Sequence, residues 1–311
     1  MIKELFISLF LFCVSVFSQT KDTTIDLIAD KNFSNGVGLE YVDHSKSVID
    51  TLYPFGKKNS RYEWKLAQWF SKFNLEGSQP AYHGDSVTFA NKGKRITFVN
   101  NNGGSQVNME IFGSNEFLSA RKAGEAWPHL LLEQNFSRPI NINKIKSMKF
   151  SLNTKLLYCG NKMGVATYNP KLQTAHFHVT FIIQNLNKSS TDYEDYLWFQ
   201  LQIYDYRYKV IPQYEAKDKG KKDATGKFIY SLASNRLYKG NMQSKNWINM
   251  SKNLLSFIKD ALKESQAKGY LKGSLLNDMD ITTIIIGWEV SGTFDCGIAY
   301  KNLSLTADLK K

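Results

Sequence analysis

Two carboxylates stand inside runs that are otherwise apolar. Glu133 lies in HLLLEQNF (129–136) and Glu289 in ITTIIIGWEVS (281–291). An unpaired carboxylate is costly to bury, so each must either meet a partner or face a groove. Glycoside hydrolases use two carboxyl groups, which lie about 5 to 5.5 Å apart in retaining enzymes and farther apart in inverting ones. We therefore predict a glycoside hydrolase with Glu133 and Glu289 as acid/base and nucleophile. The alternative is that each is a structural carboxylate paired with Arg or Lys.

A second group of residue types suits elimination from an acidic sugar. Such a lyase must neutralise a carboxylate, remove the neighbouring proton and protonate the leaving oxygen, which is work for Arg, His and Tyr. The candidates are His129, His176, His178, Tyr204 and Arg207. Arg207 has an alternative role as a partner of Asp205 at a strand end. The lyase and a binding protein without turnover are our second and third hypotheses.

The two histidines at 176 and 178 are one residue apart, a spacing that can bind a metal. A third ligand is not evident at an obvious distance in the sequence. We therefore predict hydrogen-bonding histidines, no metal site and no cofactor, and leave open a structural calcium ion in a loop. The sequence also lacks HExxH, GxSxG, paired CxxC and a phosphate-cradling glycine loop.

The stretch 174–208 must position most of these side chains. It contains TAHFHVTFIIQN, a polar turn and LWFQLQIYDYRY, which predicts two antiparallel strands joined by a loop. Alternate residues of a strand point to opposite faces. The expected core rows are Phe177, Val179, Phe181 and Ile183, then Phe199, Leu201 and Ile203. The opposite rows are His176, His178, Thr180 and Gln184, then Trp198, Gln200, Gln202, Tyr204 and Tyr206.

These polar and aromatic rows predict a groove that holds a polysaccharide. Aromatic rings offer flat surfaces to sugar C–H groups, and amides bond hydroxyls as donor and acceptor. The alternative is a solvated sheet face. The predicted substrate-binding residues are Glu110, Asn108, Trp127, His129, His176, His178, Gln184, Trp198, Gln200, Gln202 and Tyr204. Glu110 is also the reserve catalytic carboxylate.

Strand signals recur along the chain from Ser86 to Ala307, bounded by glycine and asparagine turns. The one convincing helix is the amphipathic segment 251–268, with Ser251 as its cap and Gly269 at its end. We predict an all-β sandwich with one helix. Residues 19–311 are expected to form a single domain with an irregular N-terminal lead-in.

The first 18 residues are typical of a secretion signal, with Lys3 followed by the apolar run LFISLFLFCVSVF. We therefore expect a secreted or periplasmic protein whose mature chain starts near Gln19. Its two remaining cysteines, Cys159 and Cys296, form an even pair in an oxidising compartment, so a disulfide between them is an option.

The chain carries 40 Lys and Arg against 28 Asp and Glu, a formal net charge of +12. In an exported protein this favours an acidic glycan partner over nucleic acid. Many basic secreted proteins bind nothing acidic, so a neutral polysaccharide or oligosaccharide stays open. We expect no nucleic-acid partner, no membrane association and a monomer.

Several motifs resemble secreted jelly-roll, concanavalin-like proteins of polysaccharide-degrading bacteria. They are GEAWPHLLLEQ (124–134), DYLWFQLQIYDYRY (195–208), DATGKFIY (223–230) and IIIGWEVSGTFD (284–295). The resemblance implies a jelly roll whose curved sheet binds glycan on its concave face, and it does not imply catalysis, since the scaffold also serves lyases and binding modules. The chain lacks the ExDxxE strand of one hydrolase group and the QIH-type strand of one alginate-lyase group.

Overall fold

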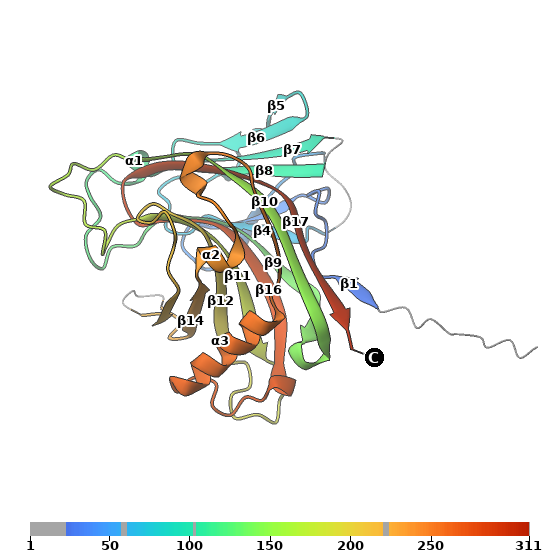
Figure 1. Ribbon diagram of the computed structural model, residues 1–311. Coiled ribbons are helices and arrows are strands. Elements are labelled where there is room, and N and C mark those ends of the chain that lie inside the picture. Colours follow the sequence, from blue (N-terminus) through green and yellow to red (C-terminus); the bar gives the residue numbers. More distant parts are fainter. Residues whose placement is uncertain (1–22, 57–60, 102–103, 220–223, 311) are drawn as a thin grey trace, which may run out of the picture.

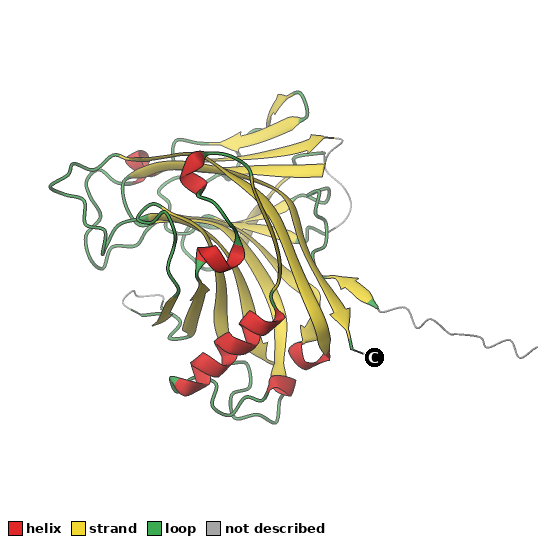
Figure 2. Cartoon of the chain, viewed as in Figure 1, coloured by secondary structure: helices red, strands yellow, loops and turns green. Residues whose placement is uncertain are grey.

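The computed structural model describes residues 23–56, 61–101, 104–219 and 224–310, and it shows two large sheets packed face to face (Figures 1 and 2). The predicted β-sandwich is confirmed. The predicted signal segment 1–18 lies outside the described residues. No described helix is long and apolar enough to span a bilayer.

The first sheet has eight strands, ordered β15-β10-β17-β8-β7-β6-β5, with β1 pairing β17 at one end. Their bounds are β1 Thr24–Asp26, β5 Ala81–His83, β6 Ser86–Ala90, β7 Lys94–Asn101, β8 Gly104–Phe112, β10 Ile145–Asn161, β15 Ile248–Asn253 and β17 Phe294–Leu309. In its longest ladder, β10 with β17, Cys159 lies directly opposite Cys296, and both are free thiols.

The second sheet has nine strands, ordered β13-β14-β12-β11-β16-β9-β4-β2-β3. Their bounds are β2 Val37–Glu40, β3 Val48–Leu52, β4 Trp64–Ala67, β9 His129–Asn141, β11 Ala175–Asn185, β12 Tyr196–Asp205, β13 Tyr214–Lys217, β14 Phe228–Leu232 and β16 Met279–Val290. The strand β9 begins directly after Pro128, because proline cannot donate to a ladder inside a sheet.

Helices are few and short. They are α1 Gly113–Glu116, α2 Ser234–Leu237 and α3 Leu255–Ala267, with 3-10 turns η1 Ile142–Lys144, η2 Met242–Ser244 and η3 Leu276–Asp278. The predicted amphipathic helix is α3, which packs against β10 of one sheet and against β12 and β14 of the other (Figure 1). It starts four residues later than expected, because Ser251 pairs with Ser151 in the β10–β15 ladder.

The core lies between the sheets and contains the predicted apolar rows of β11 and β12. The opposite side of the nine-stranded sheet, which we call the outer face, carries the polar rows. A second, smaller apolar cluster lies on it, formed by Ala67, Trp69, Leu131 and Ile285, with Phe70, Ile182 and Trp198 packed against them. The outer face is therefore partly apolar and aromatic.

One local irregularity overturns part of the predicted pattern. The β11–β12 ladder shifts register between Phe177 and His178, so Phe177 pairs Tyr204 while His178 pairs Gln202. A bulge of this kind moves the residues beyond it out of simple alternation. Tyr204 therefore belongs to the core, where its ring meets Trp288, and its predicted place in the binding groove was wrong.

Candidate functional site

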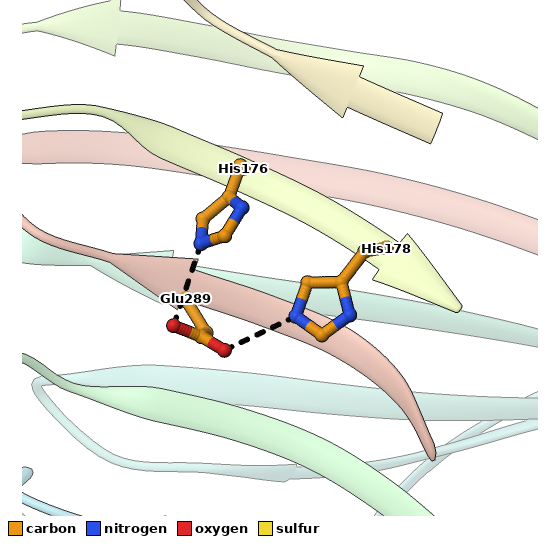
Figure 3. A group of neighbouring side chains, drawn as sticks. All are labelled: His176, His178 and Glu289. Carbon is orange, nitrogen blue, oxygen red and sulfur yellow. Dashed lines mark hydrogen bonds and ion pairs between the residues drawn. The ribbon is translucent and has the colours of Figure 1, made fainter. Parts of the chain in front are cut away.

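Glu289 is the centre of a row of side chains that crosses four neighbouring strands at one level. It pairs with His129 of β9 on one side and with His176 of β11 on the other, and His176 in turn pairs with Asp205 of β12. His178, two residues along β11 and on the same face, also turns toward it (Figure 3). The sequence predicted His129, His176, His178 and Glu289 as site residues, and the order of the strands brings them together.

Three imidazoles and one indole contact the Glu289 carboxylate. Oε2 lies 3.4 Å from His176 Nε2, 3.5 Å from His129 Nε2 and 3.1 Å from Trp127 Nε1. Oε1 lies 3.2 Å from His178 Nε2. The Glu289 side chain is 20% exposed and that of His176 21%, whereas His178 is buried at 3%. Solvent therefore reaches the cluster from the His176 side.

The other ring nitrogens are held by neighbours. His129 Nδ1 lies 2.9 Å from the Trp127 carbonyl oxygen, which can only accept, so this nitrogen carries the proton. His178 Nδ1 lies 2.8 Å from Oγ1 of the buried Thr180. Such contacts fix ring orientation and aim each Nε2 at Glu289.

The histidines control the charge of the carboxylate. Burial alone would raise the pKa of Glu289, but the charge of His129 and the hydrogen bonds of the histidines lower that pKa well below its usual range. Burial also lowers the pKa of His178, whereas the hydrogen bond and charge of Glu289 outweigh burial and raise the pKa of His176. Glu289 is thus an ionised group at neutral pH.

Glu133 shares the outer face with Glu289 but not its position along the strands. The β9–β16 register pairs Glu133 with Ile285, four residues from Glu289. At about 3.3 Å per residue this sets their Cα atoms roughly 13 Å apart. The two carboxylates therefore have different neighbours, and their action as one catalytic pair stays a prediction.

Glu133 belongs to a different group of charges. Lys65 of β4 pairs with it across the ladder, and Lys65 Nζ lies 3.2 Å from Oε1 of the fully buried Glu40. Burial, and then the charge of Glu40, raise the pKa of Glu133 to about 7, and its buried Oε1 has no hydrogen-bond partner. Glu40 could not be predicted from the sequence, because a single carboxylate in a short N-terminal strand gives no distinguishing pattern.

Trp198, Gln200 and Gln202 of β12 share the outer face, whereas Tyr206, predicted in the same row, lies with Tyr204 on the core side and packs against Phe294. Gln202 Nε2 donates to Gln200 Oε1 at 3.3 Å and lies 3.2 Å from Ser231 Oγ. Two buried polar atoms of this row, Trp198 Nε1 and Gln202 Oε1, have no hydrogen-bond partner. Both atoms are covered by the protein, whereas the side chains of Trp198 and Gln200 are half-buried and can meet a ligand on the outer face. Gln184 lies at the far end of β11, near the loop that leads to β12.

Asn108, Glu110 and Arg207, which the sequence also singled out, do not contact Glu289. Asn108 and Glu110 are on β8 of the eight-stranded sheet, where Glu110 accepts from Tyr158 Oη at 2.6 Å and pairs with Arg95. They therefore lie apart from His176 and Glu289, which the sequence could not show, because the alternating pattern of a strand does not reveal the sheet it joins. Arg207 pairs with Asp205, as the alternative stated, with Nε 2.9 Å from Oδ1.

The arrangement supplies the third metal ligand that the sequence did not reveal. One ligand atom from each of His176, His178 and Glu289 lies within 4.8 Å of the others. Two imidazoles and a carboxylate form a donor set that first-row transition ions accept. The separate pocket near Tyr300, lined by Phe33, Trp64 and Val107 among others, does not include these residues.

No known protein family matches the sequence, and neither does any curated protein. Among solved structures, the chain is similar to a family 12 xyloglucanase from Bacillus licheniformis, with 12% identity, 74% of this chain and 97% of that chain covered, and a TM-score of 0.43. An endoglucanase, cel12A, from Rhodothermus marinus gives 9% identity, 75% and 97% coverage and a TM-score of 0.41. Likeness at this level says nothing about substrate or catalytic residues.

Proposed function

We propose that this protein cleaves a polysaccharide bound across the outer face of its nine-stranded sheet. One observation carries the proposal: a solvent-reachable carboxylate, Glu289, is surrounded by three imidazoles on the same face as the indoles of Trp127 and Trp198. A carboxylate and an imidazole in contact provide a base and a proton donor. The indoles of Trp127 and Trp198 supply flat apolar surface for sugar rings.

Glu289 takes the role of base and His176 that of proton donor. Glu289 is the acceptor at the centre of the cluster, and His176 is its more exposed imidazole neighbour. In hydrolysis, the first candidate, Glu289 activates water while His176 protonates the leaving oxygen. Glu133 contacts a different group of charges, so its part in this step stays a prediction.

Elimination from an acidic glycan is the second candidate, and two observations favour it. His176 and Glu289 are 3.4 Å apart, so they act from one side of a sugar ring, and the net charge of +12 attracts polyanions. Two residues suggested for the lyase have other roles: Tyr204 is buried in the core, and Arg207 forms an ion pair with Asp205. Export, predicted from residues 1–18, remains a prediction that suits both schemes.

The test is incubation of the purified protein with neutral and acidic glycans, following new reducing ends and the ultraviolet absorbance of unsaturated uronates. Reducing ends without that absorbance indicate hydrolysis, and both together indicate elimination. Retention on a glycan with neither signal would leave a binding protein and overturn the proposed cleavage.

A further inference from the structure

We propose that His176, His178 and Glu289 bind one divalent first-row transition-metal ion on the outer face. The proposal deepens the proposed function, because it concerns the same cluster. All three come from the adjacent strands β11 and β16, so the sheet itself holds the ligand atoms in place (Figure 3). Ligands on rigid strands lose little conformational freedom when an ion binds.

The distances suit an ion better than direct hydrogen bonds alone. The imidazole nitrogens lie 3.2 to 3.5 Å from the carboxylate oxygens. Charge-assisted hydrogen bonds are shorter, about 2.7 to 2.9 Å. Ligand atoms about 2.1 Å from a four-coordinate ion lie roughly 3.4 Å from one another.

The crowding at one oxygen points the same way. Glu289 Oε2 faces Trp127 Nε1, His129 Nε2 and His176 Nε2, while Oε1 faces only His178 among these groups. One cation bound by Glu289, His176 and His178 would be shared among these crowded groups.

The neighbours of the ligands are arranged as metal sites require. Thr180 Oγ1 holds His178 Nδ1 and leaves Nε2 to face the ion. His129 stands outside the set of three and orients the carboxylate through Oε2. Three protein ligands with solvent access from the His176 side leave a coordination position open, as in catalytic rather than structural zinc sites.

The ion would change the roles of both Glu289 and His176. With the ion bound, both side chains would be ligands, and the open position would take a hydroxyl or carboxylate oxygen of the glycan. Without the ion, Glu289 and His176 are free to act as base and proton donor. Metal binding, measured with no glycan present, therefore decides between these two roles.

The experiment is a titration of the full protein, freed of metal with a chelator, with Zn²⁺ by calorimetry and with Co²⁺ by visible absorption. We expect one ion per chain and cobalt bands typical of low coordination number. The partly exposed ligand His176 gives the primary variant, His176→Ala, and Glu289→Gln gives the second; each is expected to weaken Zn²⁺ binding more than tenfold. Thr180→Val should weaken it about 10- to 100-fold by freeing the His178 ring.

His83→Ala is the matched control, because His83 is an exposed histidine on β5 of the other sheet. It should leave the affinity unchanged. Zn²⁺ binding that survives both His176→Ala and Glu289→Gln in folded protein, or no binding at all, would overturn the metal site. Either result leaves the glycan assay unaffected, and binding without glycan cleavage would overturn the proposed function alone.

Discussion

Glu289 and His176 face each other in direct register across the β11–β16 ladder, with 3.4 Å between Oε2 and Nε2. His129 occupies the equivalent position on the other flank, in register on β9. One carboxylate thus serves as the common neighbour of imidazoles from two strands. The predictions below separate its chemistry from the stability of the sheet around it.

Glu289→Gln keeps the shape of the side chain but removes its charge. We expect glycan cleavage to fall by at least about 100-fold, because the group that accepts the proton is lost. Thermal unfolding should still show a cooperative transition. Initial rates on the glycan that gives the strongest signal provide the measurement, with Glu76→Gln, an exposed carboxylate, as control. Full activity in Glu289→Gln would remove this residue from the mechanism.

Trp198→Phe tests the outer face as the glycan surface. The buried Trp198 Nε1 has no partner in the protein, so its removal should not destabilise the fold. If a sugar ring packs on this indole, the smaller ring of phenylalanine should lower the affinity about five- to tenfold. Trp247→Phe, an exposed tryptophan beside β15 of the other sheet, is the control for calorimetric binding. Equal affinities of both variants would argue against this surface.

Glu133→Gln tests the buried carboxyl group near Glu40. The pKa of Glu133 is raised from 4.5 to about 7 in the folded protein, so the unfolded chain releases this proton first as the pH rises. Its contribution to stability therefore falls between pH 4.5 and about 7, by at most about 3 kcal/mol. Glutamine stays neutral, so the variant should gain by up to that amount above pH 7.

Urea unfolding at pH 4 and pH 8 would measure this difference in the free energy of unfolding. Glu76→Gln serves again as the exposed control and should show little dependence. A stability difference between Glu133→Gln and the parent that is the same at both pH values would contradict the raised pKa.

Gly287→Ala tests the close approach of β16 to β9. Gly287 has φ +157°, and an added Cβ would lie 2.1 Å from the Leu130 carbonyl oxygen. The backbone must shift, so we expect a loss of about 3 kcal/mol in the free energy of unfolding. The control is Gly160→Ala, where the nearest atom to the new Cβ is 3.8 Å away and little change is expected. Equal denaturation midpoints for Gly287→Ala and the parent protein would show that β16 accommodates the methyl group.

Cys159 and Cys296 pair across the β10–β17 ladder. We expect a disulfide in protein recovered from an oxidising compartment. Burial raises the pKa of Cys296 well above its usual value, so protein made reduced should oxidise slowly. Mass spectrometry after denaturation and alkylation distinguishes the disulfide from two free thiols. Two alkylated cysteines in exported protein would rule out the bond.

The sequence by itself determined the faces of single strands. Side chains alternate with a period of two, so the row of His176 and His178 and the outward placement of Glu289 could be predicted from residue types alone. The same rule failed at Tyr204. A register shift between β11 and β12 changes the face on which this residue lies, and the alternation of residue types does not reveal such a shift.

Only the tertiary structure decided which rows meet. Strand β16 inserts between β9 and β11, which end more than ninety residues before it, and this order sets Glu289 among His129, His176 and His178. It also separates Glu133 from Glu289 and places Glu110 on the other sheet. Neighbour and register in a sheet follow from long-range pairing of whole strands, which no short stretch of sequence specifies.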